Sequence, residues 1–204
     1  MQADNGCRET VIDLLRHGEP VGGRRYRGQQ DDPLSEQGWE QMWQSVGERN
    51  AWQQIVTSPL LRCHAFAAAL GERHNVPVQG EARFAEVGFG AWEGKSRAEL
   101  DALIPGQVAR FYQDPVKNRP PGAEPLDEFV ARVRDGFNAV LDEHPGKSIL
   151  VVAHAGVIRG ILSHVLAMPA AAMYRINVAN AGMTSLVTDR ERGINLVSHG
   201  YVAG

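Results

Sequence analysis

The sequence predicts a three-layer α/β/α fold, with helices on both faces of a mostly parallel central sheet. Apolar runs of strand length alternate with longer segments whose apolar residues recur every three to four positions, which is typical of this class. Two of the runs end in the same way, with a histidine followed by a small residue, at His17 and His154. The 204 residues suffice for one domain, and no repeat or linker divides them. We therefore expect a single domain over residues 1–204.

The first half of the chain is expected to alternate strands with helices. A strand begins at Val11, and a helix follows Ser35, which can cap it. The apolar face of this helix has the spacing i, i+3, i+4, i+7: Trp39, Met42, Trp43 and Val46. Ser58 and Pro59 have the residue types of an N-cap and a first helical residue. The further elements expected here are strands at 54–57 and 76–79 and a helix at 59–74.

The second half begins with a segment rich in helix breakers. Residues 96–122 hold two short helical patterns interrupted by prolines, which favours a cap over a site rather than part of the core. Beyond it, apolar periodicity predicts a long helix, a second histidine strand, another helix and a C-terminal hairpin. Their expected bounds are 124–144, 149–153, 157–166, and 184–188 with 194–197.

Composition excludes several classes of protein. The net charge of −3 offers no general attraction for nucleic acid or for acidic membranes, so we expect neither as a partner. The two cysteines, Cys7 and Cys63, form no C-x-x-C pair, which suggests neither a zinc site nor a disulfide framework. The first ten residues are polar and have no apolar core, unlike a signal peptide. We expect a cytoplasmic protein.

The two histidine strands predict an anion site. In a parallel sheet, ligands bind outside the carboxyl ends of the strands, so neighbouring strands would bring His17, His154 and Arg16 into one pocket. Arginine binds two phosphate oxygens at once, and neutral histidine is a nucleophile that can carry a phosphoryl group. Arg62 lies in the first turn of its predicted helix, where anions are favoured. The pattern indicates a phosphate site with a histidine nucleophile.

Two further groups are expected at this site. The backbone N–H groups of Ala155 and Gly156 start a helix and could hold a phosphoryl oxygen as charge develops. A leaving alkoxide also needs a proton, and the candidate acids are Glu19, Glu86 and Glu93. The residues alone do not separate these three.

Six motifs, in this order, resemble the histidine phosphatase superfamily, also called the phosphoglycerate mutase-like family. They extend over most of the chain: Leu15-Arg16-His17-Gly18-Glu19, Pro33-Leu34-Ser35-Glu36-Gln37-Gly38, Ser58-Pro59-Leu60-Leu61-Arg62, Glu86 with Phe89-Gly90-Ala91-Trp92-Glu93-Gly94, Pro121-Gly122-Ala123-Glu124, and Val152-Ala153-His154-Ala155-Gly156-Val157-Ile158-Arg159. The resemblance implies a phosphoglycerate mutase-like fold. It implies that His17 is phosphorylated, that Arg16, Arg62 and His154 bind the phosphoryl group, and that Glu86 is the proton donor. It also implies phosphatase chemistry without metal or organic cofactor.

The loop after the first strand departs from the family pattern. Gly23 occupies a position where many relatives carry asparagine, and the residues that follow it, Arg24-Arg25-Tyr26-Arg27-Gly28, are unusually basic. The resemblance makes Arg27 and Gly28 candidates for substrate contacts. The cluster fits either a second anionic group on the substrate or a solvated basic loop.

Phosphoglycerate mutase-type phosphotransferases of this family carry a longer insertion between the acid and the second histidine. The short segment of sequence between Glu86 and His154 therefore favours a phosphatase. The chain is similar to α-ribazole phosphatases and to broad sugar-phosphate phosphatases, so the expected substrate is a small phosphorylated metabolite. Two other classes stay open at this point. A metallohydrolase could use His17, His154 and Glu86 as ligands, although the arginines oppose it. A non-catalytic phosphate-binding adaptor could have the same fold.

Overall fold

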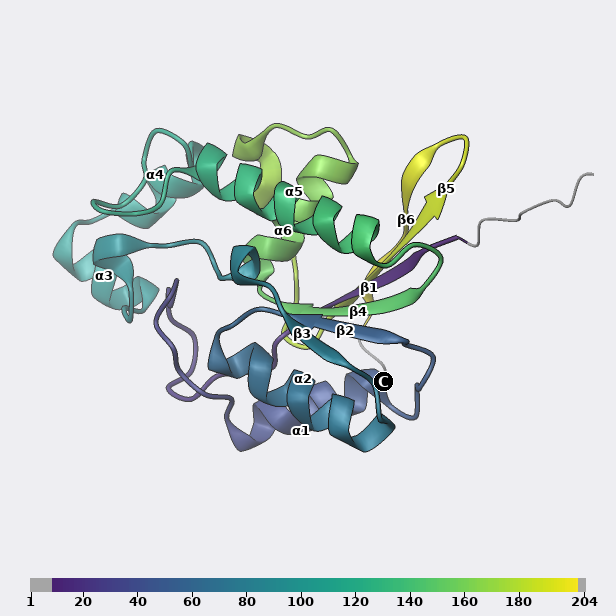
Figure 1. Cartoon of the computed structure of the whole chain (residues 1–204). Helices are drawn as coiled ribbons and strands as arrows, with labels where there is room; N and C mark the ends of the chain where they lie inside the picture. The colour runs from purple at the N-terminus through teal and green to yellow at the C-terminus, as the bar shows by residue number, and fades with distance from the viewer. Residues whose placement is uncertain (1–8, 202–204) are drawn as a thin grey trace, which may run out of the picture.

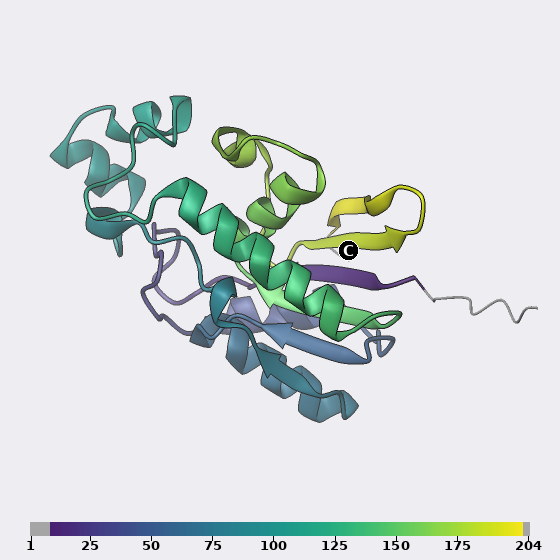
Figure 2. The same cartoon turned by 45° about the horizontal axis from the view of Figure 1, so that its top comes forward.

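The computed structural model describes residues 9–201. Residues 1–8, which include Cys7, and residues 202–204 lie outside the described part. A six-stranded sheet lies between two helical layers, as the sequence predicts (Figures 1 and 2). The strands are β1 (Val11–Arg16), β2 (Gln54–Thr57), β3 (Val78–Gly80), β4 (Ser148–Ala153), β5 (Met183–Asp189) and β6 (Gly193–Tyr201). The α-helices are α1 (Glu36–Val46), α2 (Leu61–His74), α3 (Arg97–Leu103), α4 (Gln107–Gln113), α5 (Leu126–Glu143) and α6 (Ala155–Val165). Short 3-10 helices are η1 (Ala82–Phe84), η2 (Gly90–Trp92) and η3 (Ala170–Arg175).

The sheet is mostly parallel. Its order is β3-β2-β4-β1-β5-β6, in which β3, β2, β4 and β1 run parallel and β5 pairs antiparallel with β1. The register between β1 and β4 sets Arg16 opposite Ala153. The two histidines that follow these residues therefore leave the sheet side by side.

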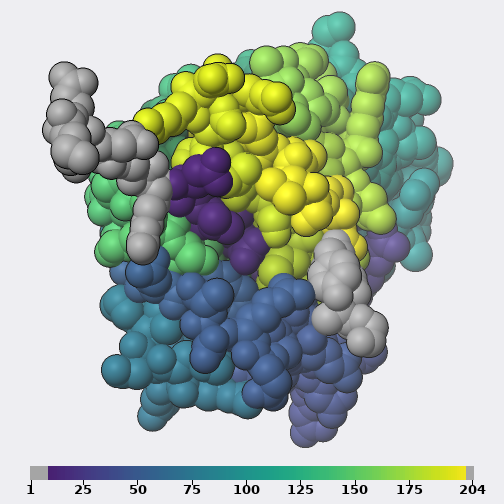
Figure 3. Space-filling view, turned by 90° about the vertical axis from the view of Figure 1, so that its right-hand side faces the viewer, coloured from purple at the N-terminus to yellow at the C-terminus, as the bar shows by residue number. Residues whose placement is uncertain are grey.

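The core has one half on each face of the sheet. Helices α1 and α2 pack on one face, where Met42 and Phe66 meet Leu15 of β1. Helices α5 and α6 pack on the other, where Phe137 and Ile161 belong to the second core cluster. Figure 3 shows the opposite end of the strands, where the start of β1 (purple) lies between the C-terminal hairpin (yellow) and the segment near residue 50 (blue).

Helix α1 begins as predicted, whereas α2 does not. The Ser35 hydroxyl accepts the Gly38 N–H at 3.0 Å, which caps α1. Helix α2 begins at Leu61 instead of Pro59, and the Leu61 N–H donates to Asp31 at 2.6 Å. Ser58 lies two positions before the N-cap residue, Leu60; its hydroxyl accepts the Leu60 N–H at 3.3 Å and lies 2.7 Å from Nε2 of His154.

The remaining elements are near their predicted places. Helix α6 begins at Ala155, two residues earlier than predicted, so His154 is its N-cap residue. The strands of the C-terminal hairpin, β5 and β6, are longer than predicted. The breaker-rich segment 96–122 forms α3 and α4, which lie beyond the carboxyl ends of the parallel strands (Figure 1).

Candidate active site

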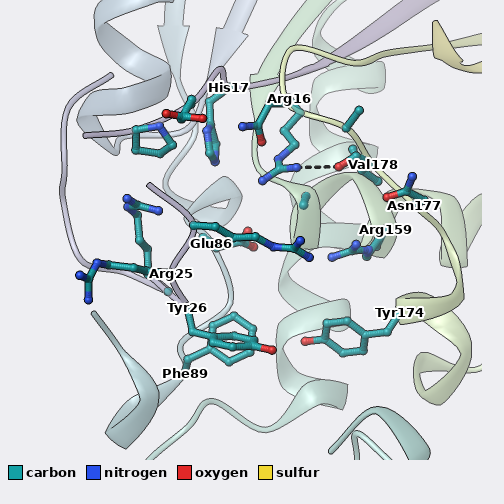
Figure 4. Close-up of a pocket in the computed structure, with 18 of the residues that line it drawn as sticks. Arg16, His17, Arg25, Tyr26, Glu86, Phe89, Arg159, Tyr174, Asn177 and Val178 are labelled. Atoms are coloured by element: carbon teal, nitrogen blue, oxygen red, sulfur yellow. Dashed lines mark hydrogen bonds between the residues drawn. The ribbon is translucent and has the colours of Figure 1, made fainter. Parts of the chain in front are cut away.

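A cavity of about 820 Å³ opens at the carboxyl ends of the parallel strands (Figure 4). Most of the predicted site residues line it: Arg16, His17, Arg27, Gly28, Arg62, Glu86 and Ala155. Arg97 and Tyr112 of the 96–122 segment also line it. Residues from distant parts of the chain therefore meet at one place.

His17 follows β1, and its backbone N–H donates to the Ala153 carbonyl at 3.0 Å. The Nδ1 atom lies 2.7 Å from the Gly18 carbonyl oxygen. Because a carbonyl only accepts, Nδ1 carries the proton and Nε2 keeps its lone pair. Burial, followed by the charges of Arg16 and Arg62, lowers the pKa of His17 well below its ordinary value. His17 is thus held as a neutral imidazole with a nucleophilic Nε2.

His154 lies next to His17 and is fully buried. The centroids of the two rings are 5.2 Å apart, and Nε2 of His154 lies 2.7 Å from the Ser58 hydroxyl oxygen. Cys63, a free buried cysteine, has its Sγ atom 3.6 Å from the same nitrogen. Burial and the nearby Arg62 lower the pKa of His154 well below its ordinary value. Its contact with Ser58 was not predicted from sequence. The parallel pairing of β2 with β4 explains it, because Ser58 directly follows β2 and its N–H donates to the Val152 carbonyl of β4.

Arg16 and Arg62 are fixed from behind by backbone carbonyls. Arg16 donates to Val178 at 2.6 Å, and Arg62 donates to Gln30 and Gly28 at 2.7 and 2.9 Å. Burial lowers the pKa of Arg16 to about 10, even though the charge of Glu86 opposes this shift. Among the described residues, the Nε atoms of both arginines are buried without a hydrogen-bond partner. Two oriented guanidinium groups with donors to spare suit a phosphoryl group.

Glu86 follows η1, and its carboxylate lies at the start of α6. Its Oε2 accepts the Gly156 N–H at 3.2 Å, and its Oε1 accepts the Val87 N–H at 2.9 Å. The Gly156 N–H, which we expected to hold a phosphoryl oxygen, thus donates to Glu86 in this structure. Arg132 donates to the carbonyls of Ala85 and Glu86 at 2.8 and 3.2 Å, which anchors the backbone at Glu86.

The other two candidate acids have different surroundings. The carboxylate of Glu93 accepts the N–H groups of Phe89 and Gln29 at 2.9 and 3.2 Å, and Glu93 is not among the residues that line the cavity. Glu93 therefore braces two loops. Glu19 lines the cavity together with Glu86.

The basic loop contributes both structure and lining. Arg27 is buried and donates to Asp32 at 2.9 Å and to the carbonyls of Val21 and Gly23 at 2.6 Å each. Gly28 has a φ of +54°, and a Cβ there would lie 2.1 Å from the Glu93 carboxylate. Arg27 thus holds its own loop together, and Gly28 is a residue that the local packing requires.

Sequence reasoning missed the far wall of the cavity. Arg159 of α6 and Tyr174 of η3 line it, followed by Asn177 and Asn180. Arg159 could have been found, because it lies four residues after Ala155 and so on the same face of the helix. The residues after α6 carried no motif that would have placed them.

The described residues contain neither a metal-binding cluster nor a membrane-spanning helix. Over 9–201, no group of three or more histidine, cysteine, aspartate or glutamate side chains is arranged to hold a metal ion. The helices of the same residues include none with the length and apolar character to cross a membrane.

Comparisons with known proteins agree with this geometry. A bifunctional protein of Mycobacterium tuberculosis is 32% identical over 201 residues, which is 95% of this chain and 55% of that protein. The chain thus spans about half the length of this relative. Glucosyl-3-phosphoglycerate phosphatase of Mycobacterium tuberculosis is 30% identical over 193 residues, covering 88% of this chain and 86% of that protein.

The fold has solved relatives as well. The crystal structure of an Escherichia coli protein provisionally named an α-ribazole-5′-P phosphatase has a TM-score of 0.80 and 26% identity, covering 95% of this chain and 97% of the other. The family model of the histidine phosphatase superfamily (branch 1) matches residues 12–200, which include every residue of the candidate site. The chain belongs to the histidine phosphatase superfamily.

Proposed function

We propose that the chain hydrolyses the phosphate monoester of a small metabolite and carries the phosphoryl group on His17 during the reaction. The observation that carries this proposal is the state of His17: it is neutral, its Nδ1 is bonded to Gly18, and it lines one cavity with Arg16 and Arg62, whose Nε donors are unused. Relatives named as phosphatases add support. Among the described residues no carboxylate forms an ion pair with Arg16 or Arg62, and buried guanidinium groups without such a partner favour an anionic ligand.

In the first step, the phosphoryl group lies between Arg16, Arg62 and His154. A bond forms from Nε2 of His17 to phosphorus as the bond to the leaving oxygen breaks, and Glu86 in its acid form gives that oxygen a proton. The arginines compensate the charge that spreads over the phosphoryl oxygens.

In the second step, the ionised carboxylate of Glu86 takes a proton from a water molecule. The water oxygen attacks phosphorus, the bond to Nε2 breaks, and inorganic phosphate leaves. Glu86 regains its acid form and His17 its lone pair, so the cycle closes. No step in this scheme requires a metal ion.

The substrate is a small phosphorylated metabolite, and the family resemblance makes sugar phosphates and α-ribazole phosphate candidates. The α3–α4 segment, residues 96–122, is the proposed cap, since Arg97 and Tyr112 extend from it into the cavity. A free buried thiol at Cys63 and a phosphorylated metabolite as substrate both suit the cytoplasm, where we place the reaction.

The test is hydrolysis of p-nitrophenyl phosphate in the presence of EDTA, by the parent chain and by its His17→Ala variant. We expect turnover that resists the chelator and disappears in the variant. Turnover that survives in His17→Ala would refute the nucleophile, and loss of activity in EDTA would favour the metallohydrolase. Phosphate binding without turnover of any ester would favour the adaptor.

A further inference from the structure

The cavity carries more positive charge than one phosphoryl group needs. Among the described residues, eight arginines line it, against two carboxylates, Glu19 and Glu86. Only Arg16 and Arg62 flank the nucleophile. The whole chain has a net charge of −3, so the excess of cations belongs to this cavity and not to the protein surface at large.

Three of these arginines form ion pairs with carboxylates of the protein. Arg25 donates to the Gly94 carbonyl at 2.7 Å and to Glu99 at 3.1 Å. Arg27 is paired with Asp32 at 2.9 Å. Arg97 lies 3.5 Å from Asp101 on its own helix. These three have carboxylate partners in the protein.

The other three, Arg24, Arg159 and Arg175, differ in this respect, and of these only Arg24 and Arg159 act on Arg16 through their charge. Arg159 donates from Nε to the Ile176 carbonyl at 2.9 Å, and its guanidinium lies over the ring of Tyr174 at 5.4 Å. Within the part of the chain that the structure describes, no carboxylate forms an ion pair with Arg159 or with Arg24. Arg159 is thus oriented by its Nε atom and by Tyr174, while its outer nitrogens remain available.

Arg24 and Arg159 line the same cavity as Arg16. Figure 4 shows Arg159 between Arg16 and Tyr174, pointing into the cavity from the wall opposite Tyr26. Of the positive charges that lower the pKa of Arg16, those of Arg159 and Arg24 have the largest effects. Like charges brought together without a counter-ion repel each other, and an anion between them relieves that repulsion.

Resting on the phosphatase activity proposed above, we propose that Arg159 and Arg24 bind a second anionic group of the substrate, a carboxylate or a phosphate. The substrate body would then lie against Tyr174 and Tyr26, between this subsite and His17. This selects metabolites with two separate anionic groups, such as phosphorylated hydroxy acids and bisphosphates. It disfavours α-ribazole 5′-phosphate, whose other end is an uncharged ring system.

The test uses substrate pairs that differ only in the second group. One pair is 3-phosphoglycerate and glycerol 3-phosphate, which exchanges a carboxylate for an alcohol; the other is fructose 1,6-bisphosphate and fructose 6-phosphate. We expect the parent chain to prefer the doubly anionic member of one pair by about tenfold or more in kcat/KM, the effect of one hydrogen bond between charged groups. The pair that shows the preference identifies the carboxylate or the phosphate.

Two variants assign the preference to residues. In Arg159→Met and in Arg24→Met the ratio of kcat/KM within that pair should fall toward one. Arg24 is exposed and has no side-chain partner in the described structure, so its variant keeps the test independent of any loss of folding in Arg159→Met. The matched control is Arg110→Met, since Arg110 lies outside the cavity and donates to its own loop at Pro105.

A binding measurement separates this inference from the proposed activity. Calorimetric titration of the same pairs into His17→Ala protein requires no turnover, and it should show the same preference. Absence of p-nitrophenyl phosphate turnover in the parent chain would refute the activity. Equal affinity for both members of both pairs, or an unchanged ratio in Arg159→Met and Arg24→Met, would overturn the subsite.

Discussion

Replacing Gly156 by alanine tests how Glu86 is held. A Cβ at this position would lie 2.1 Å from Oε1 of Glu86 and 3.1 Å from its Cδ atom. The carboxylate must therefore move, because ordinary contacts of a Cβ begin at 3.4 Å. The movement exceeds about 1 Å, and displacing a catalytic group by that distance costs about 100-fold in rate.

The fold should tolerate this change. Alanine is favoured over glycine inside a helix by about 1 kcal/mol, which offsets a weakened bond between the Gly156 N–H and Glu86. We expect the free energy of unfolding to change by less than about 1 kcal/mol. A loss of activity would then come from the position of the acid and not from unfolding.

The assay compares two leaving groups. An alkoxide needs a proton from the acid in order to leave, whereas p-nitrophenolate leaves without one. Gly156→Ala should therefore lower kcat far more for an alkyl phosphate than for p-nitrophenyl phosphate. Gly160→Ala is the control, since it adds the same methyl group to α6 but meets the side chain of Val133 in the core at 3.2 Å. An equal loss for both substrates, or no loss for either, would refute the role of Glu86.

Three other changes probe the site. Ser58→Ala removes the hydroxyl beside His154 and should lower kcat by about tenfold and the unfolding free energy by about 1–2 kcal/mol, as measured by steady-state kinetics and urea unfolding; unchanged kinetics would contradict this. Gly28→Ala forces a side chain into the Glu93 carboxylate at positive φ and should destabilise the fold by about 1–3 kcal/mol, measured as a lower melting temperature. The unfolding free energy should fall as the pH drops below 6.5. In the unfolded chain His17 and His154 then take up protons, whereas in the folded protein their lowered pKa values keep both histidines neutral. His17→Ala should reduce that slope in urea titrations, and an identical slope would count against a neutral His17.

Much of the fold followed from local patterns. The twin strand endings identified β1 and β4 as neighbours, and their parallel register brings His17 and His154 together. Apolar periodicity located α1 and α5, since each buries one face against the sheet. Sequence patterns of this kind are reliable where one short segment determines its own structure.

The rest depended on contacts between distant segments. Ser58 has the residue type of an N-cap, but α2 begins two residues later than this predicts. The Ser58 hydroxyl contacts both the Leu60 N–H and His154, and Asp31 from another loop accepts the Leu61 N–H. The Gly156 N–H goes to Glu86, which is 70 residues away in the chain. Spacing along one segment does not reveal which distant group competes for a donor or an acceptor.

The most direct test of the account is to look for the phosphorylated enzyme. The parent chain is mixed with a substrate labelled in its phosphoryl group, quenched in alkali within the first turnover, and mapped by peptide mass spectrometry. We predict a phosphohistidine at His17 that survives alkali, is lost in acid, and is absent from His17→Ala. Product formation without any labelled His17, or label on another residue, would contradict the mechanism.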